Sequence, residues 1–99
     1  MASTKDYKDF IMSQLGEIGD IKCRPMMGEY ILYYKNVVFG GIYDDRFLVK
    51  KVDNNRKYKM EEAIPYPKGK PMYYVEDVDN QEEIKNIVLD TYEGLKNDK

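Results

Sequence analysis

The most specific stretch of the sequence is Arg24-Pro25-Met26-Met27-Gly28-Glu29-Tyr30. Arg24 stands among apolar neighbours, Glu29 opens the next apolar run after Gly28, and Lys50 ends a later one. Guanidinium and ammonium groups bind carboxylates and phosphates through charge-assisted hydrogen bonds, so one interpretation is a pocket for a small anion. A second interpretation is structural, with an Arg24–Glu29 ion pair that fixes the turn. The candidate binding residues are Arg24, Met27, Gly28, Glu29, Tyr33 and Lys50.

The residues that most catalytic mechanisms require are missing from the sequence. There is no histidine, which removes the commonest general base, the commonest zinc ligand and every Ser–His or Cys–His pair. Neighbouring acids fall in expected turns or at a helix start, where they have structural roles. We therefore expect no catalytic residue, no metal and no cofactor, and an enzyme is the least favoured class of function. These acids are Asp44-Asp45, Glu61-Glu62, Asp77/Asp79 and Glu82-Glu83.

The elements that would position the candidate residues begin with an N-terminal helix. Apolar residues recur at helical spacing in the first part of the chain. Ser3 or Thr4 can cap the start of this helix, and Gly16 marks its end. The pattern predicts a helix over residues 4–17 with one apolar face.

Short apolar runs separated by polar turns follow this helix. The first run contains Pro25, which cannot donate to a strand ladder and therefore favours an edge strand or a bulge. Short turns between successive strands imply an antiparallel meander. Alternation predicts that Phe39, Gly41 and Tyr43 share one face. The predicted strands cover residues 21–27, 29–34, 37–43 and 47–50.

The remainder of the chain predicts a linker, a loop, a strand and a helix. Residues 53–63 are polar with only a weak helical signal, and prolines break any regular element in 64–71. A short strand is predicted over 72–75. Asp79 or Asn80 then caps a final amphipathic helix.

The fold class that these elements predict is α+β. We expect a two-layer domain, in which an antiparallel meander sheet is covered by the N-terminal and C-terminal helices. The 99 residues fit a single domain over 1–99. Hydrophobic residues make up 42% of the chain and charged residues 34%, which is typical of a folded protein rather than a disordered one.

The charge of the chain is small overall but unevenly distributed. A net charge of −2 gives no global attraction to nucleic acid or to an anionic membrane. Lys and Arg are concentrated in residues 46–70, and Asp and Glu in 71–99. These segments are either contact surfaces for a partner or a solvated loop beside a solvated acidic helix. Direct DNA binding, which we expect least among the binding functions, would use Lys50, Lys51, Arg56, Lys57 and Lys59 with Tyr58.

The sequence also predicts a cellular location and an assembly state. The N-terminal residues lack the apolar segment of a signal peptide, and no apolar run is long enough for a transmembrane helix, so we expect a cytoplasmic protein without membrane contact. Cys23 is the one cysteine, and we expect it to be a small buried hydrophobic residue in a strand. An edge strand can pair with a copy of itself, and we predict a monomer or a weak homodimer.

Two stretches of the chain resemble the TfoX/Sxy N-terminal domain family. The first runs from Arg24 to Tyr33 with the sequence Arg-Pro-Met-Met-Gly-Glu-Tyr-Ile-Leu-Tyr. The second runs from Val38 to Lys50 with the sequence Val-Phe-Gly-Gly-Ile-Tyr-Asp-Asp-Arg-Phe-Leu-Val-Lys. The family pattern has an arginine, then Met-Phe-Gly or Met-Met-Gly, and later a Leu-x-Leu/Val-Lys strand. The Met-Met-Gly-Glu-Tyr sequence here differs from the Met-Phe-Gly-Gly form of the competence regulators.

This resemblance implies a bacterial regulatory domain. Named family members promote expression of DNA-uptake genes in natural competence, together with the cyclic-AMP receptor protein, and in them a second domain follows this one. The resemblance therefore implies a stand-alone regulatory protein-interaction domain whose partner belongs to the transcription machinery. We expect the partner to contact the acidic final helix or the basic 46–70 segment. The alternative is a small-molecule or anion-binding module with a pocket near Arg24 and Lys50. The resemblance implies no catalytic residues.

Overall fold

The computed structural model describes residues 3–97 and contains an antiparallel six-stranded sheet with a helix before and a helix after it. Residues 1–2 and 98–99 of the expected 1–99 domain lie outside the described residues. The elements in chain order are α1 (Lys5–Leu15), β1 (Ile21–Met26), β2 (Glu29–Tyr34), β3 (Val37–Ile42), β4 (Phe47–Val49), the 3-10 helix η1 (Asp53–Tyr58), β5 (Glu61–Ala63), β6 (Met72–Tyr74) and α2 (Gln81–Asn97).

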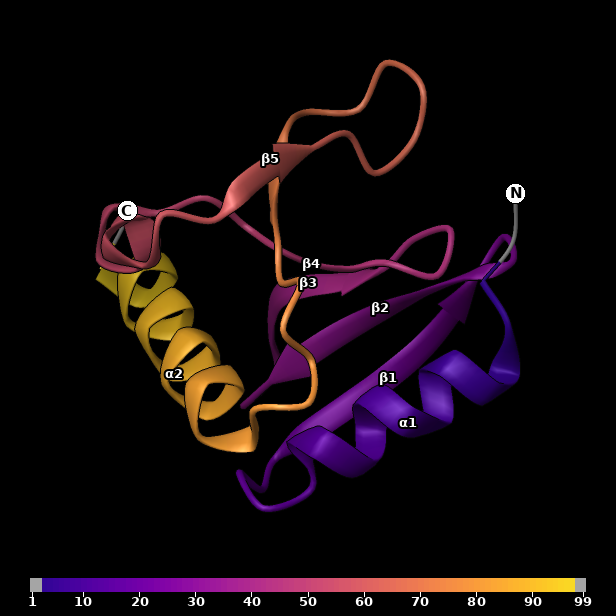
Figure 1. Cartoon of the computed structure of the whole chain (residues 1–99), viewed down its shortest axis with the longest axis horizontal. Coiled ribbons are helices and arrows are strands. Elements are labelled where there is room, and N and C mark those ends of the chain that lie inside the picture. The colour runs from indigo at the N-terminus through magenta and orange to yellow at the C-terminus, as the bar shows by residue number, and fades with distance from the viewer. Residues whose placement is uncertain (1–2, 98–99) are drawn as a thin grey trace.

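The α+β architecture expected from the sequence is confirmed. The first four strands form a meander, and the strand order across the sheet is β1-β2-β3-β4-β6-β5. β6 therefore lies between β4 and β5, and the connection between β5 and β6 projects from the top of the molecule, away from both helices (Figure 1). β1 is an edge strand, as Pro25 predicts, because that position needs no second ladder of hydrogen bonds.

Both helices begin at caps that the sequence contains. The Thr4 side chain accepts a hydrogen bond from the Tyr7 backbone N–H at 3.2 Å. The Asn80 side-chain oxygen accepts one from the Glu83 N–H at 3.1 Å. These bonds satisfy N–H groups that have no partner inside the helix, which fixes where each helix starts. Gly16 caps the end of α1, which is slightly shorter than predicted.

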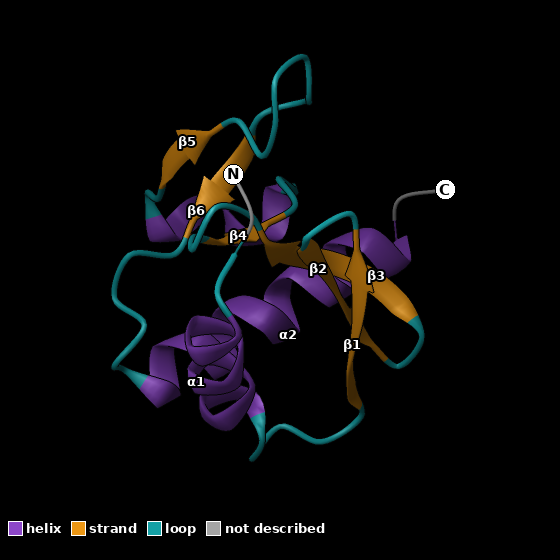
Figure 2. Cartoon of the chain, turned by 90° about the vertical axis from the view of Figure 1, so that its right-hand side faces the viewer, coloured by secondary structure: helices purple, strands orange, loops and turns teal. Residues whose placement is uncertain are grey.

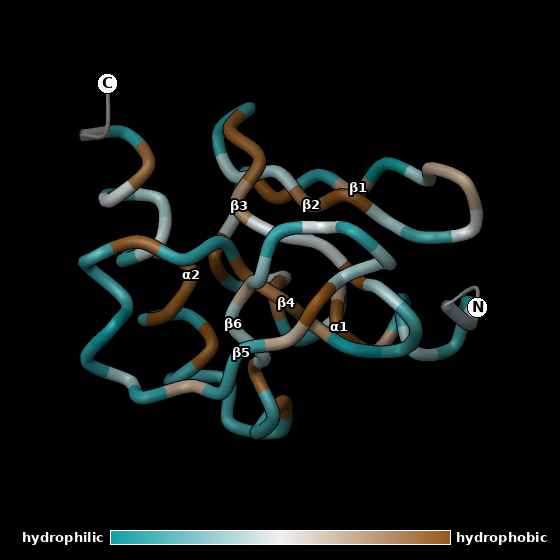
Figure 3. Tube along the Cα trace, turned by 90° about the horizontal axis from the view of Figure 1, so that it is seen from above, coloured by the Kyte–Doolittle hydropathy of each residue, from teal (hydrophilic) through white to brown (hydrophobic). Residues whose placement is uncertain are grey.

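One hydrophobic core holds the two helices against the sheet. Figure 2 shows α1 and α2 beside each other, with β1, β2 and β3 on one flank and β4, β6 and β5 above. Hydrophobic residues recur along α2 and on β3 and β4, whereas most of the connecting segments are hydrophilic (Figure 3). Neither helix in the described part of the chain combines the length and apolar composition that a membrane crossing requires. The buried cluster consists of Ile11, Leu15, Leu32, Tyr34, Phe39, Ile42, Phe47, Val49, Tyr73, Val75, Ile84, Ile87 and Val88.

The prediction that Phe39 shares a face with Gly41 and Tyr43 is wrong. The β2–β3 register shifts between Leu32 and Tyr33, which inserts a bulge into β3. Phe39 therefore turns into the core and packs edge-on against Phe47 at 6.5 Å between ring centroids. Gly41 does lie beside Tyr43, since a Cβ atom on Gly41 would stand 2.7 Å from the Tyr43 ring.

The polar linker over 53–63 contains two elements that the sequence predicted weakly or not at all. Its first half forms η1, in line with the weak helical signal. Its second half is β5, which pairs with β6 at the edge of the sheet. Glu61 and Glu62 are exposed, so no apolar alternation marks this strand, and its pairing partner lies in a different part of the sequence.

Candidate functional site

The candidate residues occupy distinct places in the structure, and the first is the tip of the β1–β2 hairpin. Met26 pairs with Glu29, so Met27 and Gly28 form a two-residue turn. Both have positive φ, 52° at Met27 and 84° at Gly28, which is the pattern of a type I′ turn. The Met27 side chain is 96% exposed and that of Met26 54%. The tip thus presents adjacent methionines to solvent on a tight turn.

Glu29 is held in a structural network rather than in a pocket with Arg24. Its carboxylate oxygen accepts hydrogen bonds from the Ser3 N–H at 3.1 Å, the Ser3 hydroxyl at 2.7 Å and the Asp44 N–H at 3.1 Å. Asp45 completes the network by accepting from the Thr4 N–H at 2.7 Å. We call this network the N-terminal clamp, because it joins the start of α1 to two hairpins.

Arg24 and Tyr33 lie together on the face of the sheet opposite the core. Arg24 pairs with Ile31 and Tyr33 with Val38, and all point away from the core cluster. Arg24 and Tyr33 line a shallow hollow of about 320 Å³. Lys50 lies in a separate hollow. The other residues lining the Arg24 hollow are Lys22, Cys23 and Asn36.

Lys50 lines a larger cleft, which we call the basic cleft. Its volume is about 590 Å³, and it lies between the β3–β4 region and the loop of residues 64–71. Among the lining residues, lysines come from both sides: Lys50 and Lys51 follow β4, and Lys68 and Lys70 belong to the loop. The remaining lining residues are Val38, Gly40, Tyr43, Pro65, Tyr66, Gly69, Pro71 and Met72.

The loop is fixed against the sheet by side-chain contacts at its base. Arg46 donates from Nη2 to the Ile64 carbonyl at 2.9 Å and from Nε to the Tyr43 carbonyl at 3.2 Å. The rings of Tyr43 and Tyr66 lie 6.1 Å apart between centroids. Pro65 is buried. These contacts give the cleft a defined wall although the loop has no regular secondary structure.

A buried hydrogen-bond network fixes the backbone at Lys50, on the side of the cleft opposite the 64–71 loop. Asn55, fully buried, donates at 2.8 Å to the Lys50 carbonyl and at 2.8 Å to the Thr91 hydroxyl. The same Asn55 side chain accepts from the Val52 N–H at 3.2 Å. Thr91 in turn donates to the Ile87 carbonyl. The backbone at Lys50 is thereby tied to α2.

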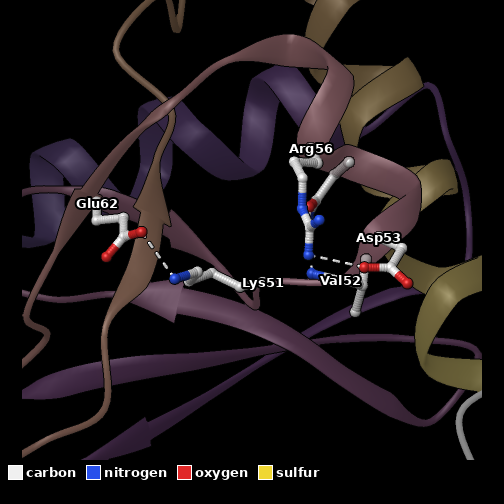
Figure 4. A network of polar contacts seen from close by, with 6 residues as sticks. Lys51, Val52, Asp53, Arg56 and Glu62 are labelled. Atoms are coloured by element: carbon white, nitrogen blue, oxygen red, sulfur yellow. Dashed lines mark hydrogen bonds and ion pairs between the residues drawn. The ribbon is translucent and has the colours of Figure 1, made fainter.

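Other basic residues of the 46–70 segment are neutralised by acids. Lys51 forms an ion pair with Glu62 at 2.8 Å, and Arg56 forms one with Asp53 at 2.8 Å (Figure 4). Lys57 pairs with Asp90 on α2 at 3.1 Å. The residues proposed for direct DNA binding are therefore divided between the cleft and a mixed-charge surface.

Burial changes the ionisation of two side chains in and near the candidate sites. Burial, followed by the proximity of Tyr66 and Glu29, raises the pKa of the Tyr43 hydroxyl. Partial burial also raises the pKa of the Cys23 thiol, which holds its proton at neutral pH. Cys23 lies in β1 and packs against the core, but it is partly buried and not fully buried as the sequence predicts. Residues 3–97 contain no group of three or more acidic, cysteine or histidine side chains arranged to hold a metal ion. The cleft offers lysine ammonium groups, which bind anions, and tyrosine hydroxyls, which can donate hydrogen bonds.

Comparison with known proteins identifies the family. The profile of the TfoX N-terminal domain matches residues 13–93. The chain belongs to the TfoX N-terminal domain family. A curated relative from Spirochaeta aurantia, named "Uncharacterized 12.7 kDa protein in trpE 5'region", is 34% identical over 80 residues, which span 79% of this chain and 70% of the relative. The family is associated with competence regulation.

The residues that support the basic cleft from other parts of the chain were not predicted from the sequence. Asn55 and Thr91 have no local sequence signal that marks their role, and only their burial reveals the network. Lys68 and Lys70 were recognised as basic, but no local pattern relates them to Lys50. The loop does contain one local signal, the sequence Pro67-Lys68-Gly69. A Pro-x-Gly sequence is common in tight turns.

Proposed function

We propose that this chain is a regulatory domain that acts by binding a protein partner and not by catalysis. Membership of the TfoX N-terminal domain family supports a regulatory role. The observation that carries the proposal is Met27, a large apolar side chain that is 96% exposed at a turn position with φ of 52°. Glycine, asparagine or aspartate suits such a position, and methionine there carries a conformational cost.

The hairpin tip is the surface that we propose for the contact. Met26 and Met27 offer adjacent flexible apolar side chains, and methionine adapts to the shape of an apolar partner surface. The turn holds them at the end of two paired strands, so the backbone needs little further ordering on binding. The partner accordingly has an apolar recess into which one or both thioether side chains insert. The family association favours a partner from the transcription machinery.

The test is affinity capture from lysate of the source organism, with quantitative mass spectrometry. The bait is the full chain, compared with Met27→Asn and with Ile64→Asn. Ile64 is also an exposed apolar residue, 45% exposed, but it lies at the start of the 64–71 loop, in a separate hollow beside Arg46. We expect a stoichiometric protein that binds the wild type and the Ile64 variant and is depleted about ten-fold or more with Met27→Asn.

The proposal fails if Met27→Asn captures the same proteins as the wild type. The proposed regulatory role is tested separately, by the expression profile of a strain that lacks the protein. We expect a defined set of transcripts to change in that strain, and Met27→Asn to reproduce the change. An unaltered profile under conditions where the protein is made would contradict a regulatory role.

A further inference from the structure

The basic cleft contains more positive charge than the chain itself balances. Within the described residues, no carboxylate forms an ion pair with Lys50, Lys68 or Lys70, whereas Lys51 is paired with Glu62. Like charges gathered around one cleft repel one another, and the repulsion is relieved when an anion enters. We propose that the basic cleft is a binding site for a small organic phosphate that carries two or more negative charges.

The loop is built so that its lysines stay beside the cleft. The Gly69 N–H donates to the Tyr66 carbonyl at 2.8 Å, with Pro67 and Lys68 between them. Lys68 has φ of 70°, so this is the pattern of a type II turn, in which the third residue favours glycine or asparagine. A lysine at that position adds a charge to the cleft where turn geometry alone would select a smaller residue.

The chemistry of the lining favours phosphate over other anions. Lysine ammonium groups act as point charges, and several of them around one cleft suit a group with two or more charges spread over several oxygens, as in a phosphate. No arginine lines the cleft within the described residues. Tyr43 and Tyr66 supply aromatic surface and hydroxyl donors beside the lysines. A volume of about 590 Å³ suits a compact molecule such as a nucleotide.

A nucleic-acid strand fits the charge distribution less well. Binding along a phosphate backbone requires a continuous basic track. The basic residues that follow Lys51 in the sequence do not extend the cleft in that way, because Arg56 is paired with Asp53 and Lys57 with Asp90. The unbalanced charge is confined to one cleft, which is the arrangement expected for a small ligand.

The experiment measures binding of inorganic pyrophosphate and ATP to the full chain by isothermal titration calorimetry, with thermal unfolding as a second readout. The test variant is Lys68→Asn/Lys70→Gln, because asparagine tolerates positive φ and both side chains are exposed. The control Lys85→Gln/Lys96→Gln makes the same change of charge on α2. We expect wild type and control to bind, and the test variant to lose about ten-fold in affinity for each lysine removed.

Several outcomes would overturn the proposal. The first is no binding of either probe at millimolar concentration, and the second is an equal loss of affinity in the test and control variants. The third is that the dicarboxylate succinate binds as tightly as the phosphate probes. The fourth is that a single-stranded oligonucleotide binds more tightly and with a steep salt dependence. The site is independent of the proposed partner contact. Met27→Asn should leave phosphate binding unchanged, so failure of one proposal does not imply failure of the other.

Discussion

The β1–β2 and β3–β4 hairpins are built on the same kind of turn but use it differently. In β3–β4 the turn residues Asp44 and Asp45 both have φ of 55°, close to the 52° of Met27. The Asp44 N–H binds Glu29, and the Asp45 carboxylate binds Thr4. Aspartate tolerates this backbone region, and in this hairpin both residues take part in the N-terminal clamp.

The tip of the β1–β2 hairpin also has positive φ at its first turn residue. Met27, however, is not a residue type suited to positive φ, and its side chain takes no part in the N-terminal clamp. Methionine is poorly suited to positive φ, and the Met27 side chain has almost no contact with the rest of the chain. Turn geometry therefore explains Asp44 and Asp45 but not Met27. When a residue breaks a local rule without a gain in folding, its role is expected to lie outside the fold. Substitutions in the two hairpins should therefore change the free energy of unfolding in different ways.

Replacing Glu29 by alanine should have the largest effect on stability. The change removes the carboxylate oxygen that accepts from the Ser3 N–H, the Ser3 hydroxyl and the Asp44 N–H. Ser3 keeps the Gly28 and Ile42 carbonyls as acceptors, whereas the Asp44 N–H loses its side-chain acceptor. We expect the free energy of unfolding to fall by about 2 kcal/mol, measured by urea denaturation. Glu29→Gln keeps one acceptor oxygen and should lose about half as much. A loss below about 0.5 kcal/mol for the alanine variant would show that the clamp does not hold the hairpin.

Thr4→Ala should have an intermediate effect. Thr4 caps α1 by accepting from the Tyr7 N–H, and its hydroxyl also donates to Asp45 at 3.2 Å. We expect a loss of about 1 kcal/mol in the free energy of unfolding. Thr4→Ser is the matched control, because serine keeps the hydroxyl and caps equally well. If serine destabilises as much as alanine, the hydroxyl is not the important group.

Tyr43, next to the Asp44–Asp45 turn, should make stability depend on alkaline pH. Burial raises the pKa of Tyr43 above its ordinary value of 10.0. The folded protein then holds this proton more tightly than the unfolded chain. The resulting stability is complete below about pH 10 and is lost as the pH rises above it. Urea denaturation at about pH 8 and about pH 10.5 should show a smaller loss for Tyr43→Phe than for wild type. Equal losses would contradict burial of the phenol.

The parts of the fold that depend on local sequence were predictable. β2 has the predicted bounds, because alternating side chains and a turn at each end define it. β5 could not be found in the same way, since exposed Glu61 and Glu62 become a strand only through pairing with β6. The Phe39 prediction was wrong for a related reason. The bulge in β3 is set by the register with β2, and the Gly40-Gly41 pair, which indicates a bulge or a close backbone approach, does not show which face Phe39 takes.

The candidate site was predictable only where its residues act locally. The sequence places the turn at Gly28 and predicts Met27 as the last residue of the strand over 21–27, whereas β1 ends at Met26 and Met27 is itself a turn residue. The role of Glu29 depends on Ser3 and Asp44 lying beside it, which is a property of the assembled fold. The basic cleft likewise depends on Arg46, which holds the loop through the Ile64 carbonyl. The predicted monomer or weak dimer stays a prediction, which light scattering at micromolar concentration would check.

The free energy of unfolding of Met27→Asn tests the central claim most directly. Asn-Gly is the sequence that favours a type I′ turn, and little packing is lost with a side chain that is 96% exposed. We expect urea denaturation to show a variant more stable than wild type by about 0.5–1 kcal/mol. That result would mean that Met27 is present at a cost to the fold and supports a role in contact with another molecule. A variant less stable than wild type would mean that Met27 serves the fold, and would contradict the account.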